Sequence, residues 1–258
     1  MSRALPNPLP SDALRGRVLL ITGAGAGLGR ATALRCARAG ATVVLLGRTI
    51  AKLEATFDAI LALGDVPEPA IYPMDLAGAS DRDMHECIDR IVESCGGLHG
   101  IVHAAAHWQD FRPMQDVLAS DWAGTLATNL NAPWALTRVA LETLKTADDG
   151  CVVFCDCEPA QQGRAFFGAY GVAKAALREM VAAWTAEQPG VRMHLFDPGP
   201  MRTTMRLLGY PGAPPETYPP PESAAEVLSA LFDPALGADA DRAGQLCWSA
   251  APPPEAAH

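Results

Sequence analysis

A tyrosine and a lysine four residues apart, Tyr170 and Lys174, are the side chains in this sequence best suited to proton transfer. A free phenol has a pKa of about 10 and is a poor base near neutral pH. Residues four apart lie on one face of a helix, so the Lys174 ammonium would favour the phenolate and lower the pKa of Tyr170. Such a pair can exchange a proton with an oxygen on which negative charge develops. Because this spacing is common by chance, its meaning depends on the surrounding elements.

A glycine-rich turn between a predicted strand and a predicted helix is the second chemical feature. The apolar run RVLLI at 17–21 leads into the turn, and the helical segment ATALRCARAG follows it. Glycines let the backbone approach a phosphate closely, and the amino end of the following helix attracts negative charge. The pattern predicts a dinucleotide site, with a tight turn that binds nothing as the alternative. The residues assigned to this site are Gly23, Gly25, Gly27, Leu28 and Gly29.

The end of the second predicted strand indicates which dinucleotide is bound. A carboxylate there would accept hydrogen bonds from a free ribose 2′-hydroxyl, but the sequence reads Leu46-Gly47-Arg48. A guanidinium can pair with a phosphate, which favours NADP, with NAD as the alternative. Arg48 could instead be a solvated residue at a helix start. After the third strand, Asp75 and Leu76 are expected at the adenine, although Asp75 could simply cap the next helix.

Seven short apolar runs alternate with helical stretches along the chain. Apolar character on both faces of each run indicates a parallel sheet covered by helices on both sides. We therefore predict an α/β fold: a single Rossmann-type doubly wound domain over 1–258, with a leader at 1–15 and a frayed tail at 250–258. The predicted strands are 17–21, 41–46, 70–74, 98–105, 150–155, 191–196 and 244–249.

Four motifs in this order resemble the short-chain dehydrogenase/reductase family over nearly the whole chain. They are Thr22-Gly23-xxx-Gly27-x-Gly29, Asn129 in a long middle helix, Tyr170-xxx-Lys174, and Pro198-Gly199 with Thr203. The strings GRAFFGAYGVAK and DPGPMRTTM are most similar to a bacterial YciK-like subgroup. The resemblance implies a homodimer or homotetramer that interconverts a carbonyl and an alcohol with NAD(P).

The resemblance also implies roles for individual residues. Tyr170 would be the general acid/base, Lys174 would activate it and hold the nicotinamide ribose, and Asn129 would steady the lysine through a water. The alternative for Asn129 is a polar contact inside a helix. Further cofactor contacts implied by the resemblance are Ala104, Tyr170 itself, Pro198, Gly199 and Thr203.

The catalytic segment departs from the family pattern at one position. The family places a serine thirteen residues before the tyrosine, where it donates a hydrogen bond to the substrate oxygen. Cys157 stands there, and no serine or threonine lies between Gly150 and Tyr170. A thiol is a weaker donor than a hydroxyl, and losing one donor to an oxyanion costs roughly 2.7 to 4 kcal/mol. This substitution puts ordinary activity in doubt and motivates an alternative function: a cofactor-binding protein with little catalysis and a regulatory or assembly role.

A second departure lies at the end of the fourth strand. The family's Asn-Asn-Ala-Gly becomes His103-Ala104-Ala105-Ala106. We expect His103 to be a core residue that replaces an asparagine tying the sheet together, rather than a catalytic one.

Proline-rich residues 200–222 are predicted to form a substrate loop, with a plain surface excursion as the alternative. From the family's geometry, we expect this loop to wall the substrate pocket together with four aromatic residues. An apolar, uncharged small molecule would suit such walls. The aromatic residues are Trp108, Phe111, Phe166 and Phe167.

The composition of the chain limits the classes of molecule that the protein is expected to bind. The net charge of −9 and the pI near 5.1 disfavour nucleic acid and anionic lipid surfaces. Prolines interrupt the opening segment where a signal peptide needs an apolar run, so we expect a cytoplasmic protein without a membrane span. The seven scattered cysteines are typical of reduced thiols and show no zinc spacing, so no metal is expected. A redox sensor among those at 151, 155 and 157 is disfavoured by the acidic neighbours Asp156 and Glu158.

Overall fold

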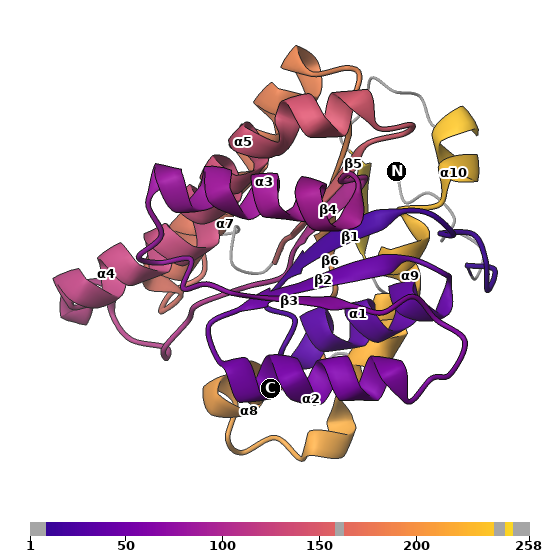
Figure 1. The fold of residues 1–258 in the computed structure, drawn as a ribbon. Coiled ribbons are helices and arrows are strands. Elements are labelled where there is room, and N and C mark those ends of the chain that lie inside the picture. The colour runs from indigo at the N-terminus through magenta and orange to yellow at the C-terminus, as the bar shows by residue number, and fades with distance from the viewer. Residues whose placement is uncertain (1–8, 158–162, 240–245, 250–258) are drawn as a thin grey trace.

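One parallel sheet organises the part of the chain that the structure, a computed structural model, describes: residues 9–157, 163–239 and 246–249 (Figure 1). Its strand order is β3-β2-β1-β4-β5-β6-β7. Each predicted apolar run overlaps one of these strands, and the ends of run and strand differ by at most two residues. The predicted single doubly wound α/β domain is confirmed. The strands are β1 (Val18–Thr22), β2 (Thr42–Gly47), β3 (Ala70–Pro73), β4 (Gly100–His103), β5 (Cys151–Cys155), β6 (Arg192–Asp197) and β7 (Leu246–Ser249).

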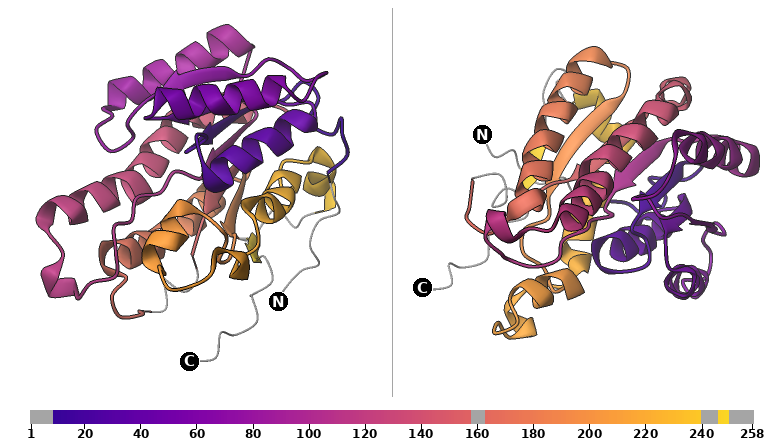
Figure 2. Two further views of the ribbon diagram at one scale, coloured as in Figure 1. Left: turned by 90° about the horizontal axis from the view of Figure 1, so that it is seen from below. Right: turned by 90° about the vertical axis from the view of Figure 1, so that its left-hand side faces the viewer.

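Helices cover both faces of the sheet. Side chains alternate along each strand, so Leu19 and Ile21 of β1 pack with α1, α2 and α9, whereas Val18 and Leu20 pack with α3, α5 and α7. Figures 1 and 2 show these two helical layers with the sheet between them. The longer helices are α1 (Gly27–Arg38), α2 (Ile50–Leu61), α3 (Asp81–Cys95), α4 (Ala119–Leu126), α5 (Ala132–Thr146), α7 (Gly168–Glu187) and α9 (Pro221–Ala230).

The order of the strands creates a switch point between β1 and β4. From β1 the chain proceeds to β2 and β3 on one side, and then returns to β4 on the other side of β1. Ligands of open α/β sheets bind at the carboxyl ends of the strands at such a point. The glycine-rich turn follows β1 there, and residues 104–118 follow β4.

The proline-rich segment contains only short regular elements, as its prolines predict. Helix α8 (Thr204–Gly209) and the single turn η3 (Pro215–Thr217) precede α9. Drawn in orange, this segment stands out from the body of the domain (Figure 2). The remaining short elements are η1 (Met114–Asp116), the π-helical turn η2 (Ala127–Asn131) and α10 (Pro234–Asp239).

The predicted leader is partly built into the core, because Leu9 and Leu14 are buried against α1 and its neighbours. Residues 1–8 and the tail 250–258 lie outside the described residues. None of the described helices combines the length and the apolar character needed to cross a bilayer. Among the described side chains, no three His, Cys, Asp or Glu residues come together as metal ligands.

Candidate active site

The glycine-rich turn after β1 packs too tightly for side chains. A Cβ on Gly23 would lie 2.8 Å from the Ala105 Cα, and one on Gly29 would overlap the Gly23 carbonyl oxygen. Gly23 and Gly27 also have φ angles of +69° and +52°, which glycine adopts without strain. These positions need glycine because the turn must fold back between the ends of β1 and β4.

The amino end of α1 fits an anionic ligand. Its N-cap, Ala26, makes no side-chain capping hydrogen bond, and the first turn contains no acidic residue. The amide groups of that turn and the positive end of the helix dipole are therefore available to phosphate oxygens. Thr203, the N-cap of α8, lies beside the turn, because a Cβ on Gly27 would be 3.3 Å from its Cγ2.

Thr22 ties the ends of β1 and β4 together. Its hydroxyl accepts hydrogen bonds from the Ala104 and Ala105 amides at 3.1 and 3.0 Å and donates to the Val102 carbonyl oxygen at 3.2 Å. This link brings the predicted cofactor contact Ala104 to the switch point, beside Gly23.

The other predicted cofactor residues occupy the same edge of the sheet. Arg48 is exposed directly after β2, where a ribose phosphate would need a cation. The Asp75 carboxylate accepts a hydrogen bond from the Ala77 amide at 3.2 Å, whereas Ser80 caps α3, so Asp75 does not cap that helix. Leu76 is buried.

The Pro198–Gly199 turn follows β6. Gly199 has a φ of +66°, and its amide donates to the Asp197 carboxylate at 2.9 Å. The turn therefore leads from the carboxyl end of β6 toward Thr203 and α8.

Tyr170 and Lys174 lie on α7, one helical turn apart, as predicted. The Lys174 Nζ is 5.6 Å from the centroid of the Tyr170 ring and donates a 2.6 Å hydrogen bond to the Cys155 carbonyl oxygen. Lys174 is only 4% exposed, so the β5 carbonyl compensates its buried charge.

The pKa of Tyr170 moves opposite to the expected direction. Burial raises the pKa of its phenol well above 10, and Cys157, Cys155 and the carboxylates of Asp156 and Asp197 act in the same direction. The phenol therefore keeps its proton at neutral pH. The sequence could not reveal this, because these neighbours come from β5, the two residues after it and the end of β6.

Asn129 lies in a π-helical turn between α4 and α5. Its side chain is buried, accepts a hydrogen bond from the His107 amide at 2.9 Å and donates one to the His107 carbonyl oxygen at 2.6 Å. Single π turns inside α-helices often occur at functional sites. Asn129 thus fixes the backbone beside Trp108.

Cys157 follows β5 and lies close enough to Tyr170 to raise its pKa. Burial raises the pKa of the neighbouring Cys155 thiol to about 12, which suppresses a reactive thiolate at that position. This disfavours Cys155 as a redox sensor.

His103 is a core residue, as predicted. Its Nε2 lies 2.8 Å from the Thr137 hydroxyl, and its ring stacks on Phe154. Burial lowers the pKa of His103 to about 3, and the Lys174 charge acts in the same direction, so the ring is neutral at physiological pH.

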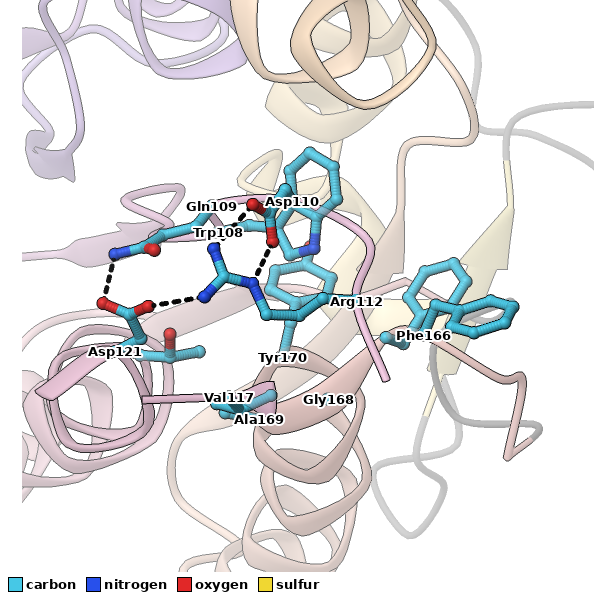
Figure 3. A pocket seen from close by; sticks show the side chains of 12 residues that line it. Trp108, Gln109, Asp110, Arg112, Val117, Asp121, Phe166, Gly168, Ala169 and Tyr170 are labelled. Atoms are coloured by element: carbon cyan, nitrogen blue, oxygen red, sulfur yellow. Dashed lines mark hydrogen bonds and ion pairs between the residues drawn. The ribbon is translucent and has the colours of Figure 1, made fainter. Parts of the chain in front are cut away.

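Tyr170 lines a small cavity beside the amino end of α7 (Figure 3). Trp108, Phe166 and Phe167 contribute to its wall, as expected, and its volume of about 30 Å³ is roughly that of one water molecule. The fourth predicted aromatic residue, Phe111, is not among the lining residues but contacts two of them, Trp108 and Phe167, at 4.8 and 5.0 Å between ring centroids. The cavity therefore has room for a reacting group and little more.

The 200–222 segment reaches this wall indirectly. Tyr210 packs against Phe111 at 5.1 Å, and Gly209 lies against Trp108, where a Cβ would come within 2.5 Å of the indole. The lining itself comes from residues 108–125 and 166–170. The expectation that the loop walls the cavity directly is therefore corrected.

A charged cluster on the cavity wall was missed by sequence reasoning. The Arg112 guanidinium pairs with Asp110 at 2.6 Å and with Asp121 at 3.2 Å, and Gln109 donates to Asp121 at 2.7 Å (Figure 3). Asp121 comes from α4, so no local spacing signals the cluster.

Comparisons with known proteins agree with this arrangement. The family model for short chain dehydrogenases matches residues 17–208. The uncharacterized oxidoreductase YciK of Escherichia coli K12 is 32% identical over 242 residues, which are 93% of this chain and 94% of YciK.

Two solved structures have the same fold with a bound dinucleotide. A short chain dehydrogenase from Shigella flexneri complexed with NADP has a TM-score of 0.87 at 30% identity, covering 93% of this chain and 99% of the other. One from Escherichia coli CFT073 complexed with NADPH gives the same TM-score and identity, covering 93% of this chain and 98% of the other. With its glycine turn, its Tyr170–Lys174 helix and these matches, the chain belongs to the short-chain dehydrogenase/reductase family of oxidoreductases and is similar to YciK.

Proposed function

We propose that the protein is an NADP-dependent reductase that converts the carbonyl of a small, partly apolar molecule to an alcohol. The observation that carries the proposal is the position of Tyr170, which lines a cavity at the carboxyl edge of the sheet while Lys174 lies one helical turn behind it. This edge also holds the glycine-rich turn.

Three features support NADP as the cofactor. The glycine turn and the uncapped end of α1 would hold the pyrophosphate. Arg48 would pair with the 2′-phosphate, as expected from the lack of a carboxylate after β2. The similar proteins from Shigella flexneri and Escherichia coli were solved with NADP and NADPH. Asp75, Leu76, Ala104, Pro198, Gly199 and Thr203 would complete the cofactor site.

The bound cofactor would supply the hydride. Tyr170 would then donate its proton to the substrate oxygen as negative charge develops there. A phenol whose pKa is raised by burial holds that proton at neutral pH, which supports reduction as the direction in which Tyr170 acts as an acid. Lys174 would stabilise the resulting phenolate and hold the nicotinamide ribose, and Asn129 would keep the adjoining backbone in place.

Cys157 would contact the substrate oxygen as a weak donor. This weakness motivates the alternative, a cofactor-binding protein with little or no catalysis. Homo-oligomerisation remains part of the proposal on the strength of the family resemblance. The cytoplasmic location expected from the sequence also remains a proposal.

Steady-state oxidation of NADPH with a panel of aldehydes and ketones tests the proposal. We expect turnover of at least one member, with NADPH preferred over NADH. NADPH binding without turnover, unrescued by Cys157→Ser, would support the alternative. Absence of NADPH binding by calorimetry would contradict both.

A further inference from the structure

The backbone of Phe166 adopts a conformation that an aromatic residue rarely takes. Its φ angle is +73°, and among the described non-glycine residues only Asp149 shares a positive φ. A side chain in this left-handed region costs free energy, and such strain clusters at functional sites. Phe166 stands two residues before α7 and four before Tyr170.

Contacts from outside the segment hold Phe166 in this conformation. Its carbonyl oxygen accepts a 3.3 Å hydrogen bond from the Arg112 amide. The Arg112 side chain is in turn fixed by Asp110 and by Asp121 of α4. The segment before α7 is thus tied to the segment after β4 at the residue that has the unfavourable φ angle.

The Phe166 ring remains available for a ligand. It lines the cavity with Tyr170, yet 54% of its surface is exposed, whereas the neighbouring Phe167 packs against Phe111. Figure 3 shows Phe166 and Asp121 at opposite ends of the lining. The charged cluster and the open aromatic ring therefore form different parts of the wall.

Exposed apolar side chains also lie near Val117 in the sequence. Met114 and Leu118 are 55% and 60% exposed and flank Val117, which lines the same cavity. A Cβ on Gly168, the first residue of α7, would lie 3.3 Å from the Val117 side chain, so Val117 packs against the start of that helix. Val117 therefore lies beside the first residue of α7, two residues after Phe166.

We propose that Phe166 is a specificity-determining residue that binds the apolar group of the substrate outside the cavity. The inference rests on the proposed function and specifies its substrate class: carbonyl compounds that carry an aryl or extended alkyl group. The carbonyl enters the cavity of about 30 Å³ beside Tyr170, and the apolar group, which cannot fit there, covers the exposed ring. The strained backbone is what directs the ring to the entrance.

A matched pair of ketones tests the contact. Butanone and benzylacetone differ by a phenyl group at the end of the chain. For Phe166→Ala we expect kcat/KM for benzylacetone to fall about tenfold, the scale of a lost apolar contact, while the value for butanone stays within about twofold. Leu61→Ala, which shortens a side chain of similar exposure (45%) at the far end of α2, is the control and should change neither value. An unchanged ratio in Phe166→Ala would overturn the inference.

Binding is measured separately from turnover. A failure of the proposed reductase function can therefore be distinguished from a failure of the proposed Phe166 contact. In the presence of NADPH, benzylacetone should raise the melting temperature of the wild type and lose most of this effect in Phe166→Ala. A wild type that shows this Phe166-dependent shift but no turnover would contradict only the reductase proposal. A shift that Phe166→Ala retains would overturn the Phe166 contact.

The strain is tested by comparing two truncations. Phe166→Ala keeps a Cβ at φ +73°, whereas Phe166→Gly removes it and makes the conformation unstrained. We expect the glycine variant to melt at a higher temperature than the alanine variant. The ratio of kcat/KM for benzylacetone to that for butanone should be the same in the two variants. A glycine variant that melts at or below the alanine variant would contradict the stored strain.

Discussion

Cys157 occupies the position where the family has a serine, and its thiol is the weakest part of the candidate catalytic machinery. We expect Cys157→Ser to raise kcat for carbonyl reduction at least about tenfold, because a hydroxyl donates a stronger hydrogen bond to the developing oxyanion. Cys95→Ser, which changes a half-buried thiol in α3, is a control that should leave kcat unchanged. A lower kcat in Cys157→Ser would show that the thiol itself is required.

Arg48 should determine the choice between the two nicotinamide cofactors. It is exposed at the end of β2, so its removal should affect binding rather than folding. For Arg48→Gln we expect NADPH affinity to fall about ten- to a hundredfold, the scale of a lost charged hydrogen bond, with NADH affinity nearly unchanged.

Calorimetric titration of both cofactors checks this, with Arg82→Gln on α3 as the matched exposed control. Equal losses for NADPH and NADH in Arg48→Gln would contradict the assignment of the 2′-phosphate.

The sequence predicts contacts between residues a few positions apart, but it does not predict contacts between residues that are far apart in the chain. The pairing of Tyr170 with Lys174 and the core role of His103 follow from local pattern and strand position. The upward direction of the Tyr170 pKa and the Arg112–Asp121 pair depend on groups from other elements, which no local spacing encodes.

The turn between β1 and α1 is the element on which cofactor binding depends. Gly29→Ala would place a methyl group against the Gly23 carbonyl oxygen, so the turn could not close. We expect the unfolding free energy to fall by about 2 to 3 kcal/mol and NADPH binding to weaken at least a hundredfold.

Denaturant titration and NADPH fluorescence measure the two effects. Gly124→Ala in α4 is the control: its Cβ meets nothing within 4 Å, and alanine favours a helix, so stability should rise slightly. Unchanged NADPH binding in Gly29→Ala would mean that the turn does not hold the pyrophosphate.

Elements were predictable where the hydrophobic pattern is strong. Strands β1, β2 and β5 contribute alternate side chains to the two core clusters on either side of the sheet, so their residues had to be apolar on both faces. The π turn at Asn129 could not be predicted, because it is an insertion into a helix whose pattern continues on both sides. The left-handed Phe166 was equally unpredictable, since glycine rather than phenylalanine signals that conformation.

At the scale of the whole molecule, two buried neutral histidines make stability depend on pH. Burial lowers the pKa of His103 and of His194 to about 3, below the value of about 6.5 in an unfolded chain. The unfolded state therefore binds more protons once the pH falls below about 6.5. Stability is complete above that pH and is lost as the pH falls toward 3.

Each histidine should contribute a slope of about 1.4 kcal/mol per pH unit in this window. Between pH 6 and pH 5 we expect the unfolding free energy to fall by about 2 to 3 kcal/mol, measured by urea titration. His103→Gln can keep a hydrogen bond to Thr137, and it should lose roughly half of this slope. An identical slope in the variant would show that His103 does not titrate on unfolding.

Proton donation by Tyr170 is the step on which the account depends. Tyr170→Phe keeps the ring beside Lys174 and removes only the hydroxyl, so turnover of any ketone that the wild type reduces should fall at least a thousandfold while NADPH binds with unchanged affinity. Both quantities are measured on the same preparation. Full turnover in Tyr170→Phe, with NADPH bound, would contradict the proposed mechanism.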